Sequence, residues 1–164
     1  MKKIFLIFFL VFIGFSASSN QDIYFLDIDY LINNTKKGKL IISKLQNINE
    51  QNLIKLKKKE DELKLIENDI LKKKNVISEN EYQKNINDFK NKLILFEQER
   101  DEILNNFNSI KIKELDTYFN ELTPLIEDFM EIKSIKMILD KKNIFIANEK
   151  YEITEQLIEY LNTN

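Results

Sequence analysis

Apolar residues repeat every seven positions along the first half of the chain. Leu56, Leu63, Ile70 and Ile77 form this series, within a stretch from residue 39 to residue 77 that contains neither glycine nor proline. Such spacing is typical of an α-helix that packs along a partner helix. The apolar stripe is narrow and lysines interrupt it, so it predicts a helix that contacts one partner and is otherwise exposed.

A second apolar series follows and alternates steps of four and three residues. It runs from Tyr82 to Ile110 with Arg100 as its single polar member, which either fixes the register or turns outward to a neighbouring glutamate. Past Ile110 the series shifts phase, so the helix must rotate its buried face or bend. Pro124 lies in the same region and predicts a kink or a restart of the helix, because proline lacks the backbone N–H.

The segment between the two series is polar. Asn75, Ser78 and Asn80 compete for backbone hydrogen bonds, and Ser78 is well placed to cap the helix that follows. The sequence therefore predicts an antiparallel helical hairpin over residues 39–133, with its reversal near residues 75–81.

Short segments of β-forming residues flank this hairpin. Residues 23–26 (IYFL) predict a buried strand, and residues 135–140 (IKMILD) and 143–148 (NIFIAN) predict two strands joined by a hairpin turn. Asp29 is expected to cap a short helix after the first strand, and Thr154 to cap the final helix. The fold class is thus α+β, with a small β-containing body, residues 20–38 and 134–164, at the base of a long arm.

A body of this size is marginal alone, because it buries little apolar surface and the chain has no cysteine to cross-link it. Oligomerisation would solve this problem if strands from several subunits closed a shared barrel. The residues expected in such an interface are Ile23, Phe25, Ile138 and Phe145.

Residues 1–19 predict a secretory signal peptide. Lys2 and Lys3 precede an apolar run over residues 4–15, and small residues follow. The run is shorter than the roughly 20 residues that span a bilayer, so cleavage and export are expected in preference to a permanent anchor.

Composition and charge exclude several functions. The chain has no histidine and no cysteine, and loss of the signal would leave 23 basic against 27 acidic residues. Neither an enzyme nor a cofactor or metal site is expected without the commonest general base and metal ligand. A nucleic-acid partner is not expected without a basic excess. The arms differ in charge: residues 36–74 carry twelve lysines against six acids, and residues 79–131 six basic against thirteen acidic residues, which favours their pairing.

Several segments resemble the Skp/OmpH-like family of seventeen-kilodalton periplasmic chaperones. These segments are IYFLDIDYLI at residues 23–32, GK at 38–39, LFEQER at 95–100, LTPLIEDFMEI at 122–132, and the terminal MILD, NIFIA and EITEQLIEYLN. The resemblance implies a jellyfish-shaped homotrimer with a β-barrel body and three helical tentacles. It also implies a periplasmic holdase that keeps unfolded outer-membrane proteins in its cavity without ATP.

On this reading, the thin apolar stripe of the arm would contact the client. The candidate residues are Leu56, Leu63, Ile70, Ile77, Tyr82 and Phe89, and the basic candidates are Lys72, Lys73 and Lys74. The lysines could engage acidic clients or phospholipid headgroups, or simply form a solvated face. The Arg-rich cluster that well-known members carry after the LFEQER segment is replaced by Asp101 and Glu102, so lipopolysaccharide binding does not carry over with the resemblance. The alternative function is a structural coiled-coil protein of the cell envelope, tethered by an uncleaved signal anchor.

Overall fold

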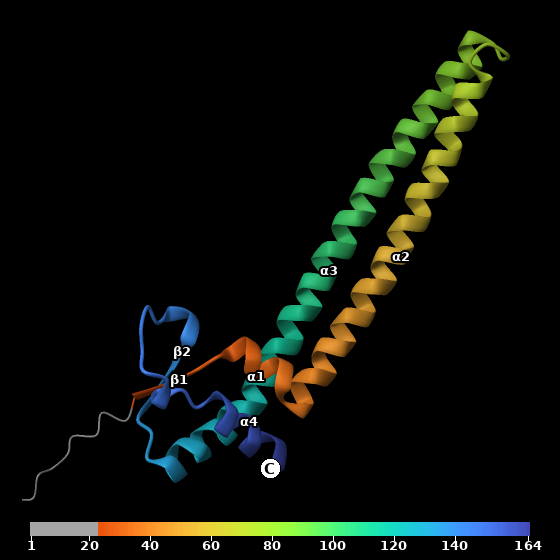
Figure 1. The fold of residues 1–164 in the computed structure, drawn as a ribbon. Helices are drawn as coiled ribbons and strands as arrows, with labels where there is room; N and C mark the ends of the chain where they lie inside the picture. The colour runs from red at the N-terminus through yellow and green to blue at the C-terminus, as the bar shows by residue number, and fades with distance from the viewer. Residues whose placement is uncertain (1–22) are drawn as a thin grey trace, which may run out of the picture.

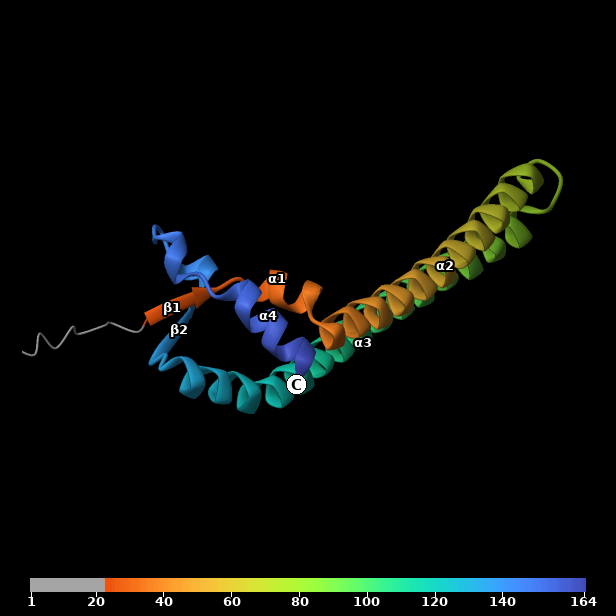
Figure 2. The same cartoon turned by 60° about the horizontal axis from the view of Figure 1, so that its bottom comes forward.

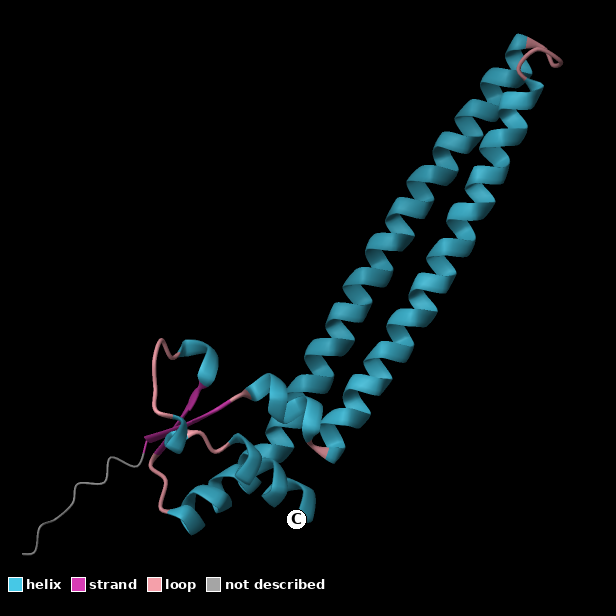
Figure 3. Ribbon diagram, in the orientation of Figure 1, coloured by secondary structure: helices cyan, strands magenta, loops and turns pink. Residues whose placement is uncertain are grey.

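The computed structural model describes residues 23–164, which form a small body and a long helical hairpin that projects from it (Figure 1). The elements are β1 (Ile23–Leu26), α1 (Ile28–Asn34), α2 (Lys36–Lys73), α3 (Glu79–Lys133), β2 (Met137–Asp140), the 3-10 turns η1 (Lys141–Asn143) and η2 (Glu149–Tyr151), and α4 (Thr154–Thr163). The long helices and the small sheet agree with the expected α+β class (Figure 3). The expected signal peptide lies outside the described residues.

Both long helices begin at side-chain caps. The Thr35 hydroxyl accepts a hydrogen bond from the Gly38 N–H at the start of α2. At the start of α3, the Ser78 hydroxyl accepts one from the Glu81 N–H, which confirms the predicted Ser78 cap. The prediction that Asp29 caps α1 is wrong. Asp27 has the extended backbone that a cap needs and accepts from the Tyr30 N–H at 2.9 Å, whereas Asp29 lies inside the first turn.

Three residues join the arm to the body, and we call them the arm root: Thr35, Gly38 and Tyr118. The Tyr118 side chain is fully buried, and its hydroxyl lies 2.7 Å from the Thr35 hydroxyl. Gly38 lies so close to the end of α1 that a Cβ there would be 1.9 Å from the Ile32 carbonyl oxygen. The sharp passage from α1 into α2 therefore needs a residue without a side chain at this position.

Tyr118→Phe removes the buried hydroxyl of the arm root but keeps the ring. We expect a loss of about 0.5–1.5 kcal/mol in the free energy of unfolding, the usual net worth of one hydrogen bond, measured by urea denaturation. Burial raises the pKa of the Tyr118 hydroxyl above its usual value of 10.0, so the folded state favours the neutral form. The wild type should consequently lose stability as pH rises above about 10. The phenylalanine variant should lack this part of the loss, and identical pH profiles would contradict the assignment.

Helix α3 continues through Pro124, so the expected restart is wrong and the expected bend is present. Residues 79–133 form one helix, which curves away from α2 near its carboxyl end (Figure 2). Proline removes one backbone hydrogen bond from the helix, and the remaining bonds on either side keep the chain helical. The bend brings the last turns of α3 beneath the sheet and α4.

The sheet has two strands, which run parallel. Tyr24 aligns with Ile138 and Leu26 with Asp140, and the other edge of β1 is covered by a bridge from Phe25 to Glu152. The predicted strand hairpin after β2 is wrong. Asp140 caps the turn η1 by accepting from the Lys142 N–H at 3.1 Å, and residues 144–148 are not part of a strand. A strand needs a neighbour, and no other described residue pairs with that segment.

The amino end of α4 also differs from the prediction. Ile153 occupies the cap position without a side-chain hydrogen bond, and Thr154 is the first helical residue. The Thr154 hydroxyl instead accepts from the Asp27 N–H at 2.9 Å and donates to Glu152 at 3.1 Å. Thr154 therefore joins α4 to the turn between β1 and α1. Capping rules consider only residues that are close in sequence, so they cannot predict this contact.

Candidate functional site

Salt bridges set the register of the arm. Lys37 pairs with Glu121, Lys44 with Glu114 at 2.8 Å, and both Lys55 and Lys59 with Glu99. From Lys37 through Lys44 to Lys59, each step along α2 is matched by an equal step back along α3, and Lys55 reaches the same Glu99 from one turn earlier. Hydrogen bonds from Lys55 and then Lys59 lower the pKa of the Glu99 carboxyl. The opposite charges of the two helices thus meet across the hairpin, as the charge counts predicted.

The outer half of the arm is held differently. Among the described residues, the structure shows no ion pair between α2 and α3 beyond Lys59 and Glu99. The lysines there pair within their own helix, as Lys64 does with Glu60 and Lys73 with Asp69. Packing of apolar side chains is therefore what joins the helices near the tip.

The predicted client-contacting residues lie at the seam between the two helices. Ile70 is buried, and the others, Leu56, Leu63, Ile77, Tyr82 and Phe89, are half-buried. Leu63 and Phe96 line a small cleft between α2 and α3 of about 290 Å³, just beyond Glu99. Client contact by these residues stays a prediction, and it would require part of the seam to be accessible to the client. Arg100 is half-exposed and pairs with Asp101 at 3.4 Å, so it turns outward.

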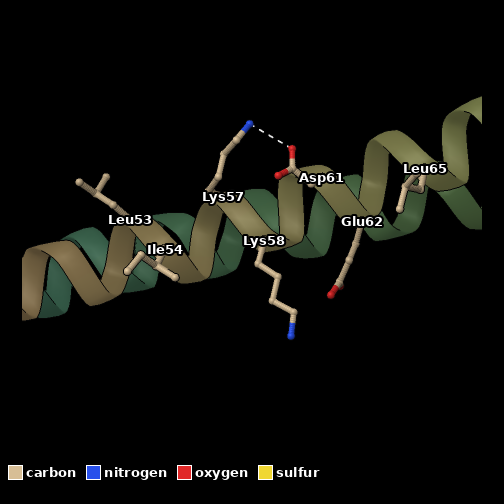
Figure 4. Close-up of a pocket in the computed structure, with 7 residues that line it drawn as sticks. All are labelled: Leu53, Ile54, Lys57, Lys58, Asp61, Glu62 and Leu65. Atoms are coloured by element: carbon tan, nitrogen blue, oxygen red, sulfur yellow. Dashed lines mark ion pairs between the residues drawn. The ribbon is translucent and has the colours of Figure 1, made fainter.

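Other apolar residues of the arm are exposed, and sequence reasoning missed most of them because they lie off the heptad positions; Leu53 lies at the edge of the predicted apolar stripe. On the side of α2 away from α3, Leu53, Ile54 and Leu65 alternate with charged residues (Figure 4). We call this set the outer patch; its charged members are Lys57, Lys58, Asp61 and Glu62. Leu65 is 70% exposed and Ile54 is 64% exposed. Further exposed apolar residues of the arm are Leu40, Leu71, Ile94, Leu95, Leu104 and Ile112.

The tip of the arm carries the predicted basic residues. Lys72, Lys73 and Lys74 are exposed at the end of α2, and Lys73 is paired with Asp69 at 2.6 Å. Val76, in the reversal beside them, is 80% exposed. Phospholipid contact by these lysines stays a prediction.

The predicted interface residues occupy different environments in the body. Phe25 is buried, Ile138 is half-buried and Ile23 is exposed, while Phe145 is fully exposed, at 103% of its reference area. On β2, Met137 and Leu139 are also exposed, so apolar residues lie on both faces of the sheet.

Residues 23–164 contain no cluster of three acidic, histidine or cysteine side chains able to hold a metal ion. In the same residues, no helix is apolar over a length that would cross a membrane.

Comparisons with known proteins identify the family. The chain matches the model of the OmpH-like outer membrane protein family over residues 22–161. It also resembles the crystal structure of an OmpH-like protein from Caulobacter crescentus, described as a candidate outer membrane chaperone. That match has a TM-score of 0.73 and 17% identity, and it covers 94% of this chain and 91% of that one. At such identity the likeness shows the fold, and a search of curated proteins found no match. Because the family model spans nearly all the described residues, the chain belongs to the OmpH-like outer membrane protein family.

Proposed function

We propose that this protein is a periplasmic holdase, which binds unfolded outer-membrane β-barrel proteins between helical arms and keeps them from aggregating without ATP. The observation that carries the proposal is the exposed surface of the arm. Apolar side chains such as Ile54 and Leu65 lie among lysines and acids on a side of α2 that no other described element covers. Scattered apolar contacts of this kind can hold an unfolded chain without burying it permanently.

Family membership supports the same function, since the fold is shared with an OmpH-like protein described as a candidate chaperone. The charge of the arm is also compatible with loose holding. Its ion pairs are exposed, and exposed charge pairs contribute at most about 1 kcal/mol each, so we expect charge alone to hold a client only weakly.

The body supports assembly into a homotrimer, which the proposed cavity requires. Parallel sheets are normally covered on both faces, and a sheet of two strands is seldom stable alone. Here one face packs on α3 and α4, while Ile23, Met137 and Leu139 remain exposed. A shared barrel formed with other copies would cover these residues.

The direct test of the proposed function is an aggregation assay with an unfolded outer-membrane β-barrel protein, diluted from urea. We expect the mature chain to suppress light scattering in the absence of ATP and at a defined ratio of chaperone to client. A folded soluble protein of similar charge serves as the control. Aggregation that proceeds unchanged at excess chaperone would rule the proposal out.

Phe145→Asp tests the assembly. A charged side chain placed in a shared apolar interface lacks a partner, and its burial costs several kcal/mol per subunit, so we expect the assembly to dissociate. Asn47→Asp is the matched control, because it adds the same charge at an exposed position of the arm, outside the body. Light scattering that still reports a trimer for Phe145→Asp would exclude this residue from the interface.

A further inference from the structure

The arm consists of two parts that are held together differently, and Glu99 marks the boundary between them. The carboxylate of Glu99 on α3 pairs with both Lys55 and Lys59 of α2. We call residues 60–98 the outer arm and the rest of the hairpin, down to the body, the inner arm. Further ion pairs join the two helices in the inner arm, whereas the ion pairs of the described outer arm join residues of one helix.

The other polar interactions of the outer arm also lie within its separate helices. On α2, the Lys64 ammonium donates to the Glu60 carboxylate at 2.9 Å, and on α3 the Gln83 amide donates to Glu79 at 2.8 Å. Partners spaced four residues apart in this way stabilise each helix by itself. Separation of α2 from α3 would therefore break no side-chain hydrogen bond or ion pair of the described outer arm.

Apolar packing is thus what holds the outer arm closed, and this packing is loose. Within residues 60–98, all of which the structure describes, Ile70 is the only buried residue, and the seam residues Leu63, Phe89 and Phe96 are half-buried. The cleft of about 290 Å³ that Leu63 and Phe96 line lies directly beyond Glu99. Side chains that border empty space make fewer dispersion contacts. Segments held by few buried contacts open locally at a much lower cost than global unfolding.

We propose that the outer arm opens along its seam while the inner arm stays closed, and that this open form binds the client through the seam side chains. The inference rests on the proposed function and assigns to it a site that the closed arm covers. Opening would expose the apolar faces of two helices, with Leu63 and Ile70 on one and Phe89 and Phe96 on the other. Because both faces are apolar, the occupant is an apolar stretch of the unfolded client, such as the lipid-facing residues of a β-barrel strand.

Two equally buried residues of α2 allow the opening to be measured, since the chain has no cysteine. Ile70 in the outer arm and Leu45 in the inner arm are both 6% exposed. Ile70→Cys and Leu45→Cys are made in separate chains, and the rate of thiol labelling of each folded chain is divided by its rate in urea. We expect labelling at least tenfold faster for Ile70→Cys. Equal rates would mean that the arm opens as a whole, and would contradict the proposal.

Glu99→Gln tests the position of the boundary. Without the carboxylate, Lys55 and Lys59 lose their partner across the seam, so the opening should extend inward to Leu56, a half-buried seam residue of the inner arm. We expect the labelling of Leu56→Cys to become at least threefold faster in the Glu99→Gln background. Glu97→Gln is the matched control, because Glu97 is an exposed residue of the same helix, and labelling there should not change. Equal effects of the two substitutions would exclude Glu99 as the boundary.

A covalent cross-link across the outer arm tests whether the client needs the open form. Ile66→Cys and Lys92→Cys, from the two helices that line the cleft, are made in one chain and joined by a short bis-maleimide. We expect at least threefold more cross-linked than uncross-linked chain to be needed in the aggregation assay. The control cross-link joins Lys44→Cys to Glu114→Cys in the inner arm, where the ammonium and the carboxylate lie 2.8 Å apart, and it should leave protection unchanged.

The outcomes separate this inference from the proposed function. If cross-linking the outer arm leaves protection unchanged, the client does not use the seam, while the proposed function stands. If the wild type and the uncross-linked chains do not protect the client, the proposed function fails and the binding site fails with it. A change of mass on cross-linking, measured by light scattering, would identify a second copy as the occupant and would contradict client binding. Circular dichroism verifies that each variant is folded.

Discussion

Shortening the arm is expected to weaken client protection strongly and leave assembly intact. The variant lacks residues 60–73 and 85–98, two heptads from each helix, so the seam keeps its phase and the arm becomes about 21 Å shorter at 1.5 Å per residue. Lys59, Glu99 and the reversal are retained. The deletion removes exposed apolar residues, among them Leu65, Leu71, Ile94 and Leu95.

Each apolar side chain that a client buries contributes about 1.5–3 kcal/mol. Loss of several such contacts should therefore raise the chaperone concentration needed to suppress aggregation by roughly tenfold or more, since each 1.4 kcal/mol is a factor of ten. A full-length chain with Leu65→Ser and Ile94→Ser is the matched control for arm length and should show an intermediate loss. Full protection by the shortened chain would place client binding on the body.

Gly38→Ala is expected to destabilise the fold, in the opposite direction to the usual effect of this change. Within a helix, alanine in place of glycine normally stabilises by about 1 kcal/mol. At Gly38 the added Cβ would meet the Ile32 carbonyl oxygen at 1.9 Å, and the contact is with backbone, which cannot rotate away. We expect a net loss of about 1–3 kcal/mol in the free energy of unfolding, as for other overpacked sites.

Urea denaturation measures this change, and Ser43→Ala provides the control, because Ser43 is an exposed residue of the same helix. The control should shift the midpoint little or slightly upward. If Gly38→Ala proves as stable as the wild type, α1 and α2 can move apart at no cost, and the close approach at the arm root is not needed for folding.

The arm was predictable because its determinants are local in sequence. The heptad spacing of Leu56, Leu63 and Ile70 predicts a helix that packs on one partner, and the Ser78 cap follows from the residue type at a helix start. Opposite charges on the two helices predicted their pairing, and the structure adds which residues meet, such as Lys44 with Glu114.

The body was harder to predict because its contacts join distant parts of the chain. Both Asp27 and Asp29 are good caps by type, and only the geometry of the turn after β1 selects Asp27. The Thr154 hydroxyl accepts a hydrogen bond from the Asp27 N–H and does not cap its own helix. The apolar run at residues 143–148 has the composition of a strand, yet strand formation depends on a neighbour, and no residue in the described part of the chain pairs with this run.

The candidate site was predicted only in part. Heptad reasoning selects seam residues such as Ile70, which the partner helix covers. The apolar residues of the exposed outer patch lie at helix positions outside the heptad seam. Their presence at those positions was therefore visible in the sequence. A search for large apolar residues off the seam would have found Ile54 and Leu65.

The hydrogen bonds between α4 and the start of α2 affect the order in which the arm and the body fold. The Lys36 backbone N–H donates to the Asn162 side-chain oxygen at 2.8 Å, and the Lys36 ammonium donates to the Asn162 carbonyl oxygen at 2.7 Å. β1 likewise can pair only after β2 has been synthesised, more than a hundred residues later. Contacts of such long sequence separation form slowly, whereas the hairpin joins residues on either side of one reversal. During synthesis and release the arms would therefore be helical before the body closes. Their exposed apolar side chains would be accessible before the body has folded and the copies have assembled.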